Sequence, residues 1–118
     1  MNKALPLATV LISTFMFLFF TIGSSIKASD EEAVHKLIET ATTSEDHIKI
    51  AEYYEKQAVG AERKSSFHAS MADAYKKRGK PLTGLAKHCE NLAKNYTEVA
   101  QEYKAMATEH REMAKEKK

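Results

Sequence analysis

The sequence predicts an all-α protein, in which a short N-terminal helix precedes an antiparallel hairpin of two long helices. Two long segments contain almost no Pro or Gly, and the helix-breaking residues Gly79 and Pro81 stand between them. In both segments small and apolar residues recur at alternating steps of three and four, the spacing of a coiled coil. Because the loop is so short, the two helices must pack antiparallel.

Residues 1–28 have the order of a secretory signal peptide. Lys3 makes the start positive, no charge follows between residues 4 and 23, and small and polar residues come next. We expect cleavage near Ser25 or Ala28, which leaves one domain over residues 29–118 and implies a periplasmic or secreted bacterial protein. The alternative is an uncleaved leader that anchors the chain in a membrane, since the apolar stretch approaches the ~20 residues of a membrane span.

The first helix of the mature chain is expected over about residues 29–41. Ser29 or Asp30 would cap it, because Glu32 stands three residues after Ser29 as in a capping box. The polar run 42–44 would end this helix.

The second helix is expected over about residues 45–78, with Thr43 or Ser44 as its cap and Asp46 or His47 behind it. Gly79 fits the position that follows its C-terminus. The third helix is expected over about residues 82–116, with Pro81 suited to its first turn.

The coiled-coil spacing predicts which residues form the seam between the two long helices. In the second helix they are His47, Ala51, Tyr54, Ala58, Ala61, Ser65, His68, Ala72 and Tyr75. In the third they are Leu85, Cys89, Leu92, Tyr96, Val99, Tyr103, Met106, His110 and Met113, with Ala86, Ala93, Ala100, Ala107 and Ala114 beside them. So wide an apolar stripe predicts pairing into a four-helix bundle on dimerisation, or docking on another protein.

The charge balance argues against a nucleic-acid partner. The chain has 18 basic and 16 acidic residues, and removal of Lys3 and Lys27 with the leader leaves 16 of each. Acids and bases alternate along the helices, as on a solvated face. No residue pattern of a catalytic site stands out in the sequence, so we expect a protein that is not an enzyme. The expected partner is a second copy or another envelope protein, and a membrane only if the leader stays uncleaved.

The histidines suggest an alternative function, which is binding of copper or, second, zinc. His-x-x-Met occurs twice, and residues three apart share a helix face. Imidazole nitrogen and thioether sulfur suit copper, especially Cu(I), and Cys89 would add a thiolate. The candidate metal ligands are His68, Met71, His88, Cys89, His110 and Met113.

The predicted register argues against metal binding within one hairpin. If the loop centres near residue 82, Tyr54 faces His110 and His68 faces Tyr96. His47 and His110 are then about seven residues apart along the axis, or roughly 10 Å, too far for shared coordination. The simpler interpretation is that each seam His forms a hydrogen bond with a facing Tyr.

Two sequence motifs follow one another along the chain. The first is His…Ala-x-x-Tyr…His-x-x-Met-Ala, formed by His47, Ala51, Tyr54, His68 and Met71. The second is His-Cys-x-x-Leu-Ala-x-x-Tyr, at residues 88–96. Over residues 44–114 this pattern resembles a group of uncharacterised small exported bacterial helical proteins. The resemblance implies a cell-envelope setting and a helical fold, and it implies no activity.

Overall fold

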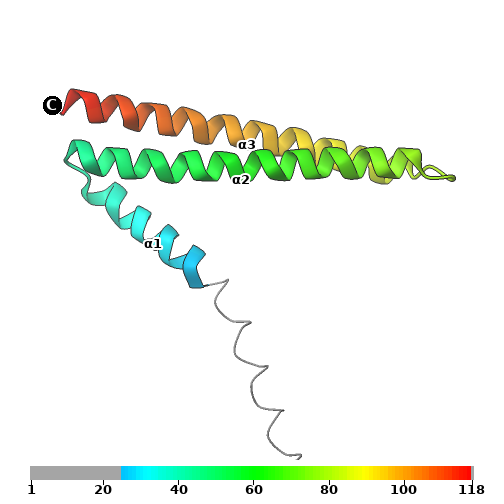
Figure 1. Ribbon diagram of the computed structural model, residues 1–118, viewed down its shortest axis with the longest axis horizontal. Coiled ribbons are helices and arrows are strands. Elements are labelled where there is room, and N and C mark those ends of the chain that lie inside the picture. The colour runs from blue at the N-terminus through cyan, green and yellow to red at the C-terminus, as the bar shows by residue number, and fades with distance from the viewer. Residues whose placement is uncertain (1–24, 118) are drawn as a thin grey trace, which may run out of the picture. The chain divides into compact units, whose positions relative to one another are not determined.

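The computed structural model describes residues 25–117, with side-chain surroundings from residue 29 onward. It contains helix α1 (Ser25–Thr40), helix α2 (Ser44–Lys77) and helix α3 (Thr83–Glu116). Figure 1 shows α2 and α3 side by side as an antiparallel hairpin, with the end of α3 beside the start of α2. The predicted all-α hairpin is therefore confirmed. Most of the predicted signal peptide, residues 1–24, lies outside the described residues.

Helix α1 begins at Ser25, four residues earlier than the sequence predicted. Ser29 and Asp30 therefore lie inside the helix, and the capping box predicted there is wrong. No Pro or Gly interrupts residues 25–29, so nothing in this stretch opposes helical backbone. Within residues 25–117, no helix is both long enough and apolar enough to cross a membrane.

Helix α2 is capped by Thr43, one of the two caps that the sequence suggested, and Asp46 completes a capping box that was not predicted. The Thr43 hydroxyl accepts from the Asp46 N–H at 3.1 Å, and the Asp46 carboxylate accepts from the N–H groups of Thr43 and Thr42 at 3.0 and 3.2 Å. Hydrogen bonding with the Thr43 side chain, and then with the two N–H groups, lowers the pKa of Asp46. This cap fixes where the 34-residue helix begins, and with it the phase of the seam.

The loop between the long helices differs from the prediction in two ways. Arg78 ends α2 in an extended conformation, and no glycine among residues 25–117 has a positive φ, so Gly79 is not a left-handed cap. Helix α3 begins at Thr83 after Leu82, which leaves Pro81 outside its first turn. Across this reversal the N–H of Leu82 donates to the carbonyl of Tyr75 at 3.1 Å, which satisfies one carbonyl at the end of α2.

The seam is confirmed in α2 and half wrong in α3. Its buried residues are His47, Ile50, Ala51, Tyr54, Ala58, Ala61 and Ala72 in α2, and Ala86, Cys89, Ala100, Ala107 and Ala114 in α3. The predicted seam residues Leu85, Leu92, Val99, Met106 and Met113 are exposed instead. The alanine that follows each of them takes the seam position. Small residues let two helices approach closely, and larger side chains are then displaced to the edge.

Candidate functional site

The two flanks of the hairpin seam have opposite chemistry. The α3 seam alternates alanine with a larger residue, in the order Ala86, Cys89, Ala93, Tyr96, Ala100, Tyr103, Ala107, His110 and Ala114. The residues directly after the larger seam residues, at positions 90, 97, 104 and 111, lie on one side of the seam, which we call the ion-paired flank. The residues directly before the seam alanines, at positions 85, 92, 99, 106 and 113, lie on the other side, which we call the apolar flank.

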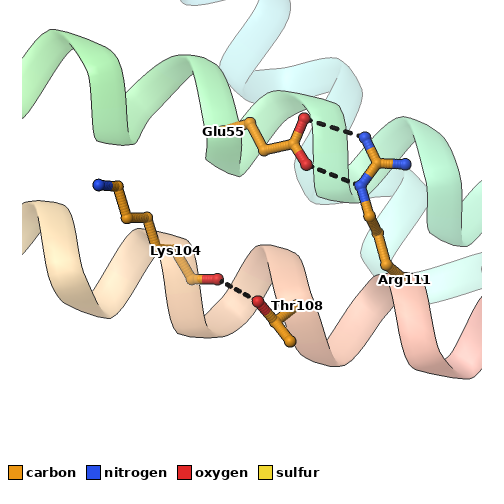
Figure 2. A network of polar contacts seen from close by, with 4 residues as sticks. All are labelled: Glu55, Lys104, Thr108 and Arg111. Atoms are coloured by element: carbon orange, nitrogen blue, oxygen red, sulfur yellow. Dashed lines mark hydrogen bonds and ion pairs between the residues drawn. The ribbon is translucent and has the colours of Figure 1, made fainter.

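The ion-paired flank is closed by contacts between α2 and α3. Both nitrogens of the Arg111 guanidinium fork bind Glu55, at 2.7 and 2.9 Å (Figure 2). This pairing lowers the pKa of Glu55 and raises that of Arg111. Lys104 pairs with Glu62 on the same flank.

The same flank continues towards the loop with two further contacts. The Ser65 hydroxyl lies 2.8 Å from the Thr97 hydroxyl and donates to the Ala93 carbonyl at 2.8 Å. Lys76 pairs with Glu90, which lowers the pKa of Glu90. The charged groups on this flank are therefore matched within one chain, and each exposed pair adds little to stability.

The apolar flank carries an uninterrupted row of exposed side chains on α3. We call this row the apolar stripe, and it consists of Leu85, Leu92, Val99, Met106 and Met113. The five are spaced seven residues apart and are 38–47% exposed. Their spacing keeps them on one face over the whole length of α3. Scattered apolar residues are ordinary on a surface, but a continuous row of this kind indicates an interaction site.

Helix α2 borders the apolar flank with fewer apolar side chains. Ile50 is fully buried and Met71 is half-buried. The Lys64 ammonium lies 5.3 Å from the centre of the Tyr96 ring, so its charge rests on an aromatic face. Phe67, one turn beyond Lys64 on this side of the helix, is 62% exposed. The α2 residues that border this flank are Ile50, Gln57, Lys64 and Met71. Lys64 is the one charged residue among them, and its charge lies against the Tyr96 ring.

The open end of the hairpin brings two histidines together, contrary to the sequence prediction. The Nδ1 atoms of His47 and His110 lie 3.1 Å apart, and the Tyr54 ring lies against His110 with 5.9 Å between ring centres. His110 lies against both Tyr54, which the sequence placed opposite it, and His47, with ring centres 5.9 and 5.3 Å apart. The predicted separation of the two histidines is therefore wrong, because the imidazoles reach along the helix axis.

The surroundings of His110 favour its neutral imidazole. His47 is only 8% exposed. Burial lowers the pKa of His110, the charge of His47 lowers it further, and Glu109 partly opposes both. One ring donates its Nδ1–H to the Nδ1 of the other, which a neutral pair of tautomers allows.

His68 faces Tyr96 as predicted, but the predicted hydrogen bond between them is absent. Their rings are stacked with centres 5.5 Å apart and planes 5° from parallel. Stacking directs the two ring faces at each other, so the Tyr96 hydroxyl does not reach the imidazole nitrogen. His68 Nδ1 is the one buried side-chain polar atom without a hydrogen-bond partner in the described part of the chain.

The six predicted metal ligands occupy different surroundings. His68 and Met71 are half-buried, His88 is exposed, Cys89 is buried, His110 is half-buried beside His47, and Met113 belongs to the apolar stripe. Among residues 25–117, no group of three or more His, Cys, Asp or Glu could hold a metal ion. The sequence missed His47 as the neighbour of His110, although both stand near the open ends of their helices.

Comparison of the chain with known family models, with curated proteins and with solved structures finds no match.

Proposed function

We propose that this chain is an exported cell-envelope protein that works by protein–protein association rather than catalysis, and that its partner is a second copy of itself. The observation that carries the proposal is the contrast between the two flanks. One flank is closed by ion pairs within the hairpin, whereas the other presents five apolar side chains in a row. The sequence of residues 1–28 supports export.

A second copy fits the apolar stripe because the stripe is symmetric about its middle residue. Val99 is the third of five equally spaced side chains. A two-fold axis through Val99 would place Leu85 and Leu92 of one copy against Met113 and Met106 of the other, so each apolar side chain gains an apolar neighbour. Two hairpins joined in this way form a four-helix bundle.

Charges beside the stripe favour the antiparallel arrangement of the two α3 helices. The row three residues after the stripe residues reads His88, Asn95, Glu102, Glu109 and Glu116. A parallel pair would place Glu102 and Glu109 against their own copies, and like charges in contact are destabilising. An antiparallel pair places this acidic half against the His88 and Asn95 half of the partner. The equal numbers of acids and bases after residue 28 leave no net repulsion between copies.

Sedimentation equilibrium of the exported chain, purified without an affinity tag, tests the proposal. Intact mass spectrometry first shows whether cleavage occurred near Ser25 or Ala28. We expect a reversible dimer with a dissociation constant in the micromolar range or tighter. A chain that stays monomeric up to about millimolar concentration, where association is worth only about 4 kcal/mol, would contradict self-association. A retained leader would contradict export as a free protein.

A further inference from the structure

We propose that His47 and His110 form a copper-binding site at the open end of the hairpin, with Met113 as a third ligand. This site retains His110 and Met113 from the ligands that the sequence suggested, and it adds His47. Its two imidazoles lie in the seam of one hairpin, and Met113, which also belongs to the apolar stripe, is the one residue that it shares with the proposed dimer interface.

The distance between the two nitrogens fits chelation of one ion. Ligand nitrogens at about 2.0–2.1 Å from a tetrahedral ion lie roughly 3.3 Å from each other. The two Nδ1 atoms lie 3.1 Å apart, which is within a few tenths of an ångström of that spacing. The ring planes are tilted by 34°, and both rings would have to rotate to turn their Nδ1 lone pairs from each other towards one ion.

The hydrogen bond between the two imidazoles can be replaced by two metal–nitrogen bonds without a change in the number of protons on either ring. In the hydrogen-bonded pair one imidazole holds its proton on Nδ1 and donates it to the other. On metal binding that proton moves to Nε2 of the same ring, so both Nδ1 lone pairs become ligands and both imidazoles remain neutral. Two imidazole nitrogens are ligands that suit copper as well as zinc.

Met113 distinguishes copper from zinc. It stands three residues after His110, on the neighbouring face of α3, and its side chain is 38% exposed. Thioether sulfur is a soft ligand that selects Cu(I), whereas structural zinc sites use thiolate, imidazole and carboxylate. Two imidazoles and one thioether would leave one side of the ion open to solvent at the end of the hairpin.

Metal titration of the untagged exported chain tests the site, with Cu(I) and a chromophoric Cu(I) chelator as competitor under reducing, oxygen-free conditions. We expect one copper per chain. His47→Gln and His110→Gln should each weaken binding at least tenfold, because each removes one of two imidazole ligands while a side chain that can hydrogen-bond remains in the seam. Met113→Leu should weaken Cu(I) binding and leave Zn²⁺ binding unchanged.

His88→Gln is the matched control, because His88 is exposed on the same helix and lies away from the pair. Circular dichroism of each variant reports whether the hairpin is retained. X-ray absorption of the copper-loaded wild type gives a readout that needs no variant, and we expect two nitrogen neighbours and one sulfur neighbour. Copper binding that survives both Gln variants, equal loss in His88→Gln, or tight zinc binding at the pair without copper binding would overturn the proposal.

Discussion

Truncation of one residue in the apolar stripe should weaken dimerisation by an amount that can be estimated from its exposure. Leu92 is 40% exposed in the single hairpin. Full burial of a Leu side chain is worth about 1.5–3 kcal/mol, so covering the exposed part is worth about 1 kcal/mol. A symmetric dimer contains the residue twice, so Leu92→Ala should cost about 2 kcal/mol of association free energy. That amount corresponds to a dissociation constant raised about 30-fold.

The assay is sedimentation equilibrium of wild type and variant over the same concentration range. Alanine keeps the helix, since it has the highest helix propensity. Gln101→Ala is the control, because residue 101 is exposed on α3 and lies about 200° around the helix from Val99. It should leave the dissociation constant unchanged. A Leu92→Ala dimer within threefold of wild type, or an equal effect of Gln101→Ala, would refute the assignment of the stripe as the interface.

Three further predictions concern the hairpin itself. His68→Phe should raise the free energy of unfolding by about 1 kcal/mol, because it removes a buried unsatisfied nitrogen and keeps the stack on Tyr96; chemical denaturation measures this. Thr43→Ala should lower that free energy by about 1 kcal/mol through loss of the α2 cap. In wild type the contribution of Asp46 is complete above its unfolded pKa of 3.8 and is lost as pH falls through the lower folded value, which acid titration of stability detects. Ala100→Leu should destabilise the hairpin by about 1–3 kcal/mol, because the seam at this position is buried and closely packed.

Each of these predictions has an outcome that would contradict it. Destabilisation by His68→Phe would mean that the imidazole nitrogen has a partner, such as a bound water. An acid transition that is identical in Thr43→Ala and wild type would show that the capping box does not couple to Asp46. Unchanged or increased stability in Ala100→Leu would show that the two helices do not approach closely at this layer. Ala105→Leu, at an exposed position of α3, is the control for added volume.

The helices were predictable from the sequence because local chemistry determines them. Thr43 and Asp46 form a capping box whose two halves are three residues apart, and that signal needs no tertiary information. The start of α1 was not predictable in the same way. Residues 25–29 are compatible with helix, and Ser29 can cap a helix or lie inside one. A cap residue gives a reliable boundary only where the residues before it oppose helical backbone.

The orientation of α3 could not be read from its sequence, because two neighbouring rows share the spacing of seven. Leu92 and Val99 belong to one row, and Ala93 and Ala100 belong to the other. Hydrophobicity favours the larger residues for the seam. Packing reverses that choice, because α2 also presents alanines and the two backbones can then approach closely. The apolar stripe that carries the functional proposal was therefore recognised in the sequence, but it was assigned to the seam and not to the exposed flank.

The histidine pair was missed because the predicted register treats facing residues as fixed layers, whereas long side chains reach along the helix axis. The predicted pairs His110–Tyr54 and His68–Tyr96 are both observed as ring contacts. His110 also reaches the imidazole of His47, seven residues before Tyr54 on α2. Residue spacing alone does not show how far each ring extends along the seam.

Disulfide cross-linking at the middle of the stripe tests the proposed interface most directly. In a Cys89→Ala background, which removes the native cysteine from the seam, Val99→Cys places one thiol on the proposed two-fold axis. Under mild oxidation we expect rapid formation of a covalent dimer from Val99→Cys, whereas Gln101→Cys on the opposite face stays monomeric. Equal cross-linking of the two variants, or none from Val99→Cys at concentrations where the protein sediments as a dimer, would contradict the antiparallel pairing of α3 through its apolar stripe.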